Sequence, residues 1–278
     1  MAGDLKKEGK TIGLVPTMGA LHAGHASLVR RAVEENDVCF VSVFVNPTQF
    51  NNKEDLAKYP RTLDRDTELL ASLGAEYVFA PSPEEMYSSE ELNGTFEFDF
   101  GGLDKVMEGK MRPGHFNGVV QVVSRLFYLV QPDRAYFGEK DFQQLAIIHY
   151  MVERSALKDT FGSLRIVDCP IVREQSGLAL SSRNERLSDE GRQTATNISR
   201  ILFESRERVR RMEHSDADAV EVEQQRVADA VNAVAGLETE YYEIVDTDTL
   251  QPASSFNNAT GCITVWCEGV RLIDNIRY

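Results

Sequence analysis

The sequence feature that most constrains the fold is a nearly continuous apolar run, VCFVSVFV, at Val38–Val45. Runs of this kind are typical of a parallel strand that is buried on both faces. Similar but shorter runs alternate with amphipathic stretches through the first two-thirds of the chain, which predicts a parallel sheet with helices on both faces. The predicted strands are Thr11–Val15, Val38–Val45, Glu76–Ala80, Arg134–Phe137 and Leu164–Cys169, and the predicted helices are Gly24–Glu35, Arg61–Leu73, Gly118–Val130 and Lys140–Arg154.

Two stretches interrupt this alternation. Pro81–Leu92 is rich in Pro, Ser and Glu, which predicts a surface excursion. Thr95–Phe100, TFEFDF, alternates with period two, which predicts an antiparallel or edge strand.

The pattern changes near residues 170–177, where strand–helix alternation gives way to helices followed by strands. This order favours a separate, smaller α+β domain, and we predict domains at 1–172 and 173–278. Its predicted elements are two charged helices, Leu187–Met212 and Ala217–Val234, and three strands, Tyr241–Val245, Cys262–Cys267 and Val270–Ile276.

Composition excludes several classes of protein. The formal net charge is −14, and so acidic a surface repels nucleic-acid phosphates and anionic lipids, so we expect neither as a partner. No window reaches the roughly 18 apolar residues of a membrane span, and the opening MAGDLKKEGK lacks the apolar core of a secretory signal. We therefore expect a cytoplasmic protein whose cysteines are buried thiols, namely Cys39, Cys169, Cys262 and Cys267.

The turn after the first predicted strand reads PTMGALHAGH, whereas the phosphate-binding patterns GxGxxG and GxxxxGK[ST] are absent. His22 and His25 are three residues apart at the start of a predicted helix, so they point the same way. Imidazole donors there would add to the positive end of the helix dipole, a combination that holds phosphate oxygens. Gly19 and Gly24 permit close approach of the backbone. The alternatives are a helix cap with incidental histidines, or a zinc pair.

Two further segments carry polar groups suited to a small acid. Gln49 follows the buried strand, where open α/β sheets bind ligands, and its amide suits hydroxyl and carboxylate groups. A plainly solvated loop glutamine is the alternative. The segment RPGHF places the Arg112 guanidinium and the His115 imidazole in one rigid turn.

Two more segments suit phosphate and ribose. In Gly138–Gln144, Lys140 could hold a phosphate as a point charge, Asp141 could accept from ribose hydroxyls, and Gln144 lies one helical turn on from Lys140. In Gly177–Asn184, two hydroxyls and an arginine suit a lid over ATP phosphates. The alternatives are a charged helix cap and an interdomain linker.

In this order, the segments resemble the pantoate–β-alanine ligase (pantothenate synthetase) family over nearly the whole chain. PTMGALHAGH also resembles the HxGH signature of nucleotidylyltransferases. The resemblance implies a Rossmann-like N-terminal domain that binds ATP and pantoate, and an α+β C-terminal lid domain. It further implies that ATP and pantoate, with Mg²⁺, give pantoyl adenylate and pyrophosphate, that β-alanine then gives pantothenate and AMP, and that the enzyme is a homodimer. The matching segments are PTMGALHAGH, FVNPTQF, YPRTLDRD, EGKMRPGHFNGV, FGEKDFQQL, IVRE, GLALSSRN and RLIDNI.

The resemblance also assigns residues. His25 matches the family's proton donor and His22 its partner on the phosphates, and Lys140 and Arg183 complete the expected catalytic group. Gln49, Gln144 and Arg112 are expected to bind pantoate and β-alanine, and Asp66 is a candidate for the magnesium neighbourhood. The residues expected to contact ATP are Met18, Gly19, Ala20, Leu21, His22, Ala23, Gly24, His25, Gly138, Glu139, Lys140, Asp141, Val172, Leu180, Ser181, Ser182 and Arg183.

Three rival functions are open at this point. A nucleotidyltransferase on the same scaffold would keep AMP on its product. An aminoacyl-tRNA synthetase fragment would need a basic face for tRNA, against which the net charge speaks. A nucleotide sensor would bind ATP without releasing pyrophosphate.

Overall fold

The structure is a computed structural model that describes residues 1–51, 53–213 and 215–278. The chain forms two compact units. The first comprises Met1–Glu139 and Gln144–Pro170, and the second comprises Lys140–Gln143 and Ile171–Tyr278.

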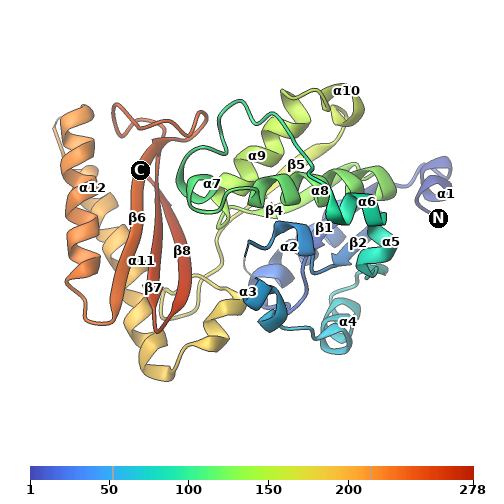
Figure 1. Ribbon diagram of the computed structural model, residues 1–278, viewed down its shortest axis with the longest axis horizontal. Coiled ribbons are helices and arrows are strands. Elements are labelled where there is room, and N and C mark those ends of the chain that lie inside the picture. The colour runs from blue at the N-terminus through green and yellow to red at the C-terminus, as the bar shows by residue number, and fades with distance from the viewer. Residues whose placement is uncertain (52, 214) are drawn as a thin grey trace. The chain divides into compact units, whose positions relative to one another are not determined.

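The first unit is built on a five-stranded parallel sheet in the order β3-β2-β1-β4-β5 (Figure 1). This confirms the predicted parallel α/β fold. Its strands are β1 (Ile12–Thr17), β2 (Val38–Val43), β3 (Tyr77–Phe79), β4 (Arg134–Gly138) and β5 (Arg165–Cys169). Its helices are α1 (Ala2–Lys7), α2 (Ala23–Glu35), η1 (Pro47–Gln49), α3 (Lys53–Lys58), α4 (Leu63–Ser72), α5 (Pro83–Met86), α6 (Ser89–Asn93), α7 (Met107–Met111), α8 (His115–Val130), α9 (Phe142–Glu153, whose first two residues belong to the second unit) and α10 (Lys158–Phe161).

The sheet of the first unit is buried on both faces, as the apolar runs predict. Val15 of β1 packs in a cluster with Val29 of α2 and Leu70 of α4. Ile12 and Leu14 point to the opposite face of the strand, because side chains alternate, and both are fully buried. Burial of each such aliphatic side chain contributes about 2 kcal/mol to the stability of the folded state.

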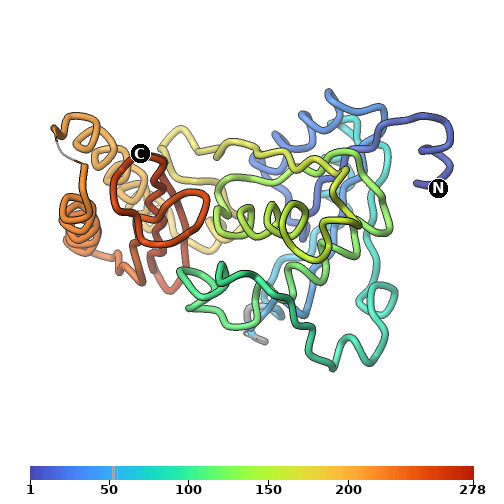
Figure 2. Tube along the Cα trace, turned by 90° about the horizontal axis from the view of Figure 1, so that it is seen from above, coloured from blue at the N-terminus to red at the C-terminus, as the bar shows by residue number. Residues whose placement is uncertain are grey.

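The segment before β1 is a short helix at the periphery of the first unit (Figures 1 and 2). Asp133, just before β4, connects it to the sheet. One carboxylate oxygen accepts from Lys6 Nζ at 2.6 Å, and the other accepts from the Ile12 backbone N–H at 2.7 Å. These bonds fix the start of β1.

The structure corrects one prediction between β3 and α8. Thr95–Phe100 is not a strand: its phenylalanines do point inward, but Phe98 stacks edge-on against Phe100 and Tyr150, and no strand of the described residues pairs with the segment. The period-two pattern of this segment therefore reflects the packing of its aromatic rings rather than strand pairing. Most of Pro81–Leu92 is exposed or half-buried, in keeping with the predicted surface excursion; the segment contains α5 and α6, and Tyr87 between them is only 3% exposed.

The second unit has an antiparallel sheet in the order β6-β7-β8, against which two helices pack. In Figure 1 these helices run from yellow-orange (α11) to orange (α12), and the strands from orange-red (β6) to red (β8). The predicted order of helices followed by strands is confirmed. The elements are η2 (Ser182–Arg186), α11 (Asp189–Val209), α12 (Ala217–Asn232), β6 (Leu237–Asp246), β7 (Ala259–Cys267) and β8 (Val270–Arg277).

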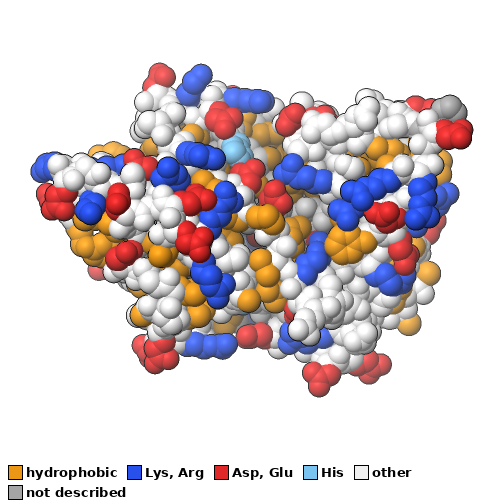
Figure 3. All heavy atoms as spheres, turned by 180° about the vertical axis from the view of Figure 1, so that it is seen from behind, with side chains coloured by type: hydrophobic (Ala, Val, Ile, Leu, Met, Phe, Trp, Pro, Cys, Tyr) orange, Lys and Arg blue, Asp and Glu red, His pale blue; other side chains and the backbone are white. Residues whose placement is uncertain are grey.

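The state of the cysteines, the presence of membrane-spanning helices and the distribution of surface charge can be examined in the described residues. All four cysteines are buried thiols, as predicted. Among the helices of the described part of the chain, none is both long enough and apolar enough to cross a bilayer. On the face drawn in Figure 3, acidic and basic side chains are interspersed.

Candidate active site

The loop between β1 and α2 is held in place by a buried carboxylate of α4. Asp66 is 1% exposed, and its two oxygens accept hydrogen bonds from the backbone N–H groups of Ala20 at 2.9 Å and Leu21 at 2.8 Å. The Thr62 hydroxyl donates a third bond, at 3.1 Å. Because hydrogen bonds to an ionised acceptor are stronger than neutral ones, Asp66 fixes the loop immediately before His22.

This loop contains two consecutive residues in the left-handed region. Gly19 has φ +80° and Ala20 has φ +51°. Glycine adopts such angles without strain, whereas alanine does not, and the bond from Ala20 to Asp66 offsets that strain. A Cβ at Gly19 would lie 3.0 Å from Asp66 Oδ2 and from Val43 Cγ1. The packing of the loop itself therefore requires glycine at position 19.

The two histidines cap α2. His22 is the N-cap residue, and its Nδ1 accepts from the Gly24 N–H at 3.1 Å. His25 Nδ1 accepts from the backbone N–H of His22 at 3.4 Å, and the ring centroids are 4.1 Å apart. A neutral imidazole whose Nδ1 accepts carries its proton on Nε2. Each ring therefore caps the helix with one nitrogen and keeps a donor on the other, beside the positive end of the helix dipole.

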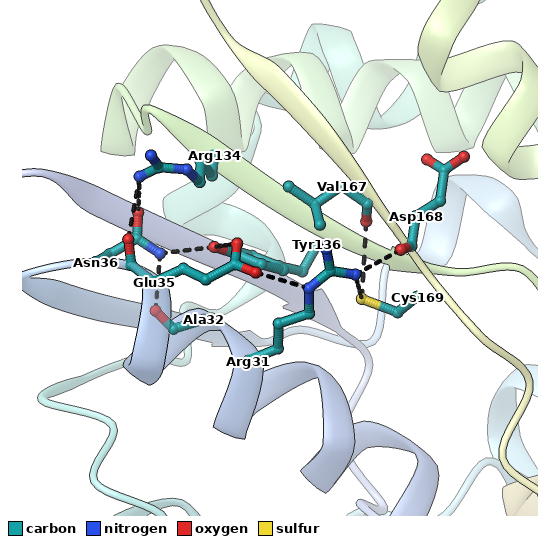
Figure 4. Close-up of polar contacts among 9 residues, drawn as sticks. All are labelled: Arg31, Ala32, Glu35, Asn36, Arg134, Tyr136, Val167, Asp168 and Cys169. Carbon is teal, nitrogen blue, oxygen red and sulfur yellow. Dashed lines mark hydrogen bonds and ion pairs between the residues drawn. The ribbon is translucent and has the colours of Figure 1, made fainter.

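A polar network ties the carboxyl-terminal half of α2 to the sheet (Figure 4). Arg31 donates to the Asp168 carbonyl at 2.7 Å and to Glu35 at 2.9 Å. The Tyr136 hydroxyl donates to the other oxygen of Glu35 at 2.9 Å and accepts from Asn36 at 2.7 Å. Because β4 and β5 supply these partners, the direction of α2, and hence of its histidine-bearing end, is fixed by the sheet.

A chain of contacts connects the same loop to the residues expected to bind substrate. Gln49 Nε2 lies 2.9 Å from Met18 Sδ. The Gln49 carbonyl accepts from His115 Nδ1 at 2.8 Å, and His115 Nε2 accepts from Arg112 at 3.2 Å. The structure thus brings together Met18, Gln49 and Arg112, which are separated in the sequence.

Behind Gln49, buried groups support η1. Asn46 is 1% exposed; its amide donates to Gln49 Oε1 at 3.3 Å and to the Gly118 carbonyl at 3.0 Å, and its oxygen accepts from the Tyr87 hydroxyl at 3.0 Å. A Cβ at Gly118 would lie 2.5 Å from the carbonyl oxygen of Thr48. The close approach of α8 to η1 therefore requires glycine at position 118.

The topological switch point of the sheet lies between β1 and β4. β1 pairs with β2 as far as Thr17–Val43, but its pairing with β4 comprises only Gly13–Arg134 and Leu14–Ala135. The carboxyl half of β1 is thus unpaired on the β4 side, and open α/β sheets bind ligands at such a point. A Cβ at Gly138, the last residue of β4, would meet no atom within 4 Å. Gly138 and Glu139 therefore lie at the carboxyl end of β4, next to this switch point.

The position of Gln144 is defined by α9. It is half-buried in the first turn of that helix. Its predicted role in substrate binding stays a prediction.

In the second unit, Lys140 and Asp141 form the turn that precedes α9. Lys140 Nζ lies 3.7 Å from Asp141 Oδ1, and the lysine side chain is 19% exposed. The backbone carbonyl of Lys140 accepts from Asn275 of β8 at 3.0 Å.

The predicted phosphate loop in the same unit is ordered by backbone bonds. The Val172 carbonyl accepts from the Leu180 N–H at 3.1 Å. The Ser181 hydroxyl caps η2, accepting from the Arg183 N–H at 3.2 Å, and Ser182 begins that helix. Val172 and Leu180–Arg183 are thereby brought into one local structure.

The described residues contain no group of three or more His, Cys, Asp or Glu side chains that could hold a metal ion. Both oxygens of Asp66 accept hydrogen bonds from the loop, and its expected place in the magnesium neighbourhood stays a prediction.

The comparisons with known proteins decide the family. The family model for pantoate-beta-alanine ligase matches residues 1–277. The chain belongs to this family. Pantothenate synthetases of Phocaeicola vulgatus and Porphyromonas gingivalis are 60% and 54% identical to it, over 99% and 98% of this chain and 94% and 93% of theirs.

Solved structures agree with this membership. The pantothenate synthetase of Thermus thermophilus superimposes with a TM-score of 0.87 at 43% identity, covering 100% of this chain and 97% of that one. The pantoate-beta-alanine ligase of Francisella tularensis, complexed with beta-gamma ATP and beta-alanine, gives 0.76 at 36% identity, over 97% and 90%. The chain is therefore a ligase of the kind that forms amide bonds.

Sequence reasoning missed several residues that shape the site. Asn46 lies within a segment that we noted, but nothing in the sequence showed that its amide would be buried. Tyr87 lies in a stretch predicted to be on the surface. Asp66 accepts hydrogen bonds from Ala20 and Leu21, which precede it by 46 and 45 residues in the sequence. Local sequence patterns give no signal for contacts over such separations.

Proposed function

We propose that this chain condenses pantoate with β-alanine at the expense of ATP, through a pantoyl-adenylate intermediate, and releases AMP and pyrophosphate. The observation that carries the proposal is the pair of imidazoles capping α2, each with Nδ1 bound to the backbone and a donor on Nε2. Gln49 contacts Met18 of the same loop, so an amide suited to a hydroxy acid lies beside the proposed phosphate site.

The first step joins two anions. A carboxylate oxygen of pantoate attacks the α-phosphorus of ATP, and the bond to the β-phosphate oxygen breaks as pyrophosphate leaves. Donors placed in advance around the phosphates stabilise the charge that develops. We assign this role to His22, His25, Lys140 and Arg183, with further ATP contacts from Met18–Leu21, Ala23, Gly24, Gly138, Glu139, Asp141, Val172, Leu180, Ser181 and Ser182.

The second step transfers the acyl group. The amine of β-alanine attacks the carbonyl carbon, the bond to the bridging oxygen breaks, and AMP leaves with that oxygen. The substrate contacts that we propose are Gln49, Gln144 and Arg112. Bound in this way, the acid is aligned with the α-phosphate before reaction, which lowers the entropic part of the barrier.

No covalent protein nucleophile is needed. Burial raises the pKa of the Cys39 thiol to about 12, with the Glu76 carboxylate adding to the effect, so this thiol stays protonated at neutral pH. Burial likewise raises the pKa of Cys169, next to α2. Activation through adenylate formation avoids the need for a thiolate.

Magnesium is proposed to enter with ATP. Mg²⁺ usually keeps several waters and binds substrate phosphates with only one or two carboxylates, and the described residues offer no cage of their own. When bound, the ion neutralises phosphate charge. We also propose a cytoplasmic location and a homodimeric assembly, in keeping with the resemblance described above.

The proposal is tested by measuring pyrophosphate and AMP separately. With ATP, Mg²⁺ and pantoate, we expect one equivalent of pyrophosphate per active site without free AMP; adding β-alanine should release AMP and pantothenate. His25→Ala and Lys140→Ala should lose the pyrophosphate burst while their thermal unfolding stays that of the parent. Pyrophosphate release that does not depend on pantoate, or AMP retained on the product after β-alanine is added, would contradict the proposal.

A further inference from the structure

A buried asparagine on β8 holds the backbone of the turn that carries Lys140. Asn275 is 5% exposed, and its Nδ2 donates to the Lys140 carbonyl oxygen at 3.0 Å. The two residues are 135 positions apart and belong to the same compact unit.

The residue before it holds the predicted phosphate loop. Asp274, also 5% exposed, accepts two hydrogen bonds from Arg173, at 2.6 and 2.8 Å. Arg173 donates in turn to the Gly177 carbonyl at 3.2 Å, at the start of the loop that continues to Arg183. The Asn275 N–H donates to Asp274 Oδ1 at 2.8 Å. Two consecutive residues of one strand therefore hold both segments that we assign to ATP phosphates.

The strand that makes these contacts is firmly anchored. β8 pairs with β7 along its length, with Cys262 opposite Asn275 and Ile263 opposite Asp274. The lysine side chain, by contrast, carries a point charge on a flexible stem, so the region that its ammonium group can occupy depends on the position of the Lys140 backbone. The hydrogen bond from Asn275 to the Lys140 carbonyl restricts that backbone position, because β8 is rigid.

We propose that Asn275 is a positioning residue, which acts on catalysis by fixing the backbone of Lys140. The inference rests on the proposed function, because it takes Lys140 to stabilise the phosphates during adenylate formation. Asn275 itself touches no reacting atom. Its loss should weaken an interaction that matters in the transition state and leave the binding of ATP nearly unchanged.

The test is Asn275→Ala, with Asn275→Leu as a second variant that fills the space, measured by pantoate-dependent pyrophosphate release. Misplacement of a reacting group by about 1 Å can cost about 100-fold in rate, so we expect kcat to fall by about 10- to 100-fold. The KM for ATP should keep its parental value, since only a transition-state interaction is lost. Asn197→Ala is the matched control: its amide also donates to a backbone carbonyl, that of Thr194 at 2.9 Å, and we expect the parental rate.

A double-mutant cycle separates positioning from a general structural effect. In a Lys140→Ala background, Asn275→Ala should change the residual rate no further; radiolabelled ATP under single-turnover conditions keeps that rate measurable. Independent, multiplying losses would overturn the inference, as would a raised KM with unchanged kcat, or failure of both Asn275 variants to fold. If the parent protein releases no pyrophosphate, or Lys140→Ala keeps its full rate, the proposed function itself fails.

Discussion

Replacing Asp66 by asparagine tests how the β1–α2 loop is held. The substitution keeps the size of the side chain but turns one of its two acceptor oxygens into a donor. Because those oxygens accept from Ala20 and Leu21 at 2.9 and 2.8 Å, one backbone N–H then faces an NH₂ group. A hydrogen bond to a charged group contributes about 1.5–3 kcal/mol, and Asp66 is buried without access to water as a substitute partner. We expect a loss of about 2 kcal/mol in stability.

The assay is urea unfolding of Asp66→Asn, followed by the pyrophosphate assay under conditions where the variant stays folded. Asp64→Asn is the matched control, because it removes the same charge from an exposed position in the first turn of the same helix and should cost only a few tenths of a kcal/mol. Release of the loop should also lower the rate of pyrophosphate formation by about tenfold or more. Parental stability and rate in Asp66→Asn would refute this account of the loop.

Three further substitutions have clear expectations. Gly118→Ala should destabilise by about 1–3 kcal/mol and raise the KM for pantoate, because the added Cβ displaces Thr48 and Gln49; urea unfolding and steady-state kinetics measure this, and unchanged values would show that α8 does not shape the site. Tyr87→Phe should cost about 1 kcal/mol in urea unfolding, because it removes a buried donor to Asn46; parental stability would contradict that. The pKa of His149 is raised above its usual value of 6.5, chiefly by its bond to Asp168 at 2.7 Å. The stability that the protonated His149 gains from Asp168 is fully present below about pH 6.5 and is lost as pH rises through the raised pKa. His149→Gln should therefore lower the free energy of unfolding by about 1 kcal/mol in acid and progressively less in alkali. A difference in stability that does not depend on pH would contradict this.

The sequence predicted well those features that depend on local periodicity. The run at Val38–Val45 correctly indicated a strand buried on both faces, although β2 ends at Val43, and the two histidines do lie at a helix N-terminus. The TFEFDF segment misled, since alternation shows which side chains point inward but not whether a neighbouring strand exists to pair with. Phe98 and Phe100 point inward without such a neighbour among the described strands.

Contacts between distant positions could not be predicted. The pairs Asp66–Ala20, His115–Gln49 and Asn275–Lys140 depend on tertiary packing, which one sequence does not reveal. The turn at Lys140–Gln143 joins the second unit although its neighbours on both sides belong to the first. The roles of the individual site residues, and the domain division at 172 and 173, stay predictions.

The central claim is that pantoate is activated as a mixed anhydride with AMP, and oxygen transfer tests it most directly. Pantoate labelled with ¹⁸O in both carboxylate oxygens would be converted with ATP, Mg²⁺ and β-alanine, and the ¹⁸O content of each product would be measured by mass spectrometry. The account predicts one labelled oxygen in each AMP, one retained in the amide, and none in pyrophosphate. Unlabelled AMP, or label in a phosphate product other than AMP, would contradict it.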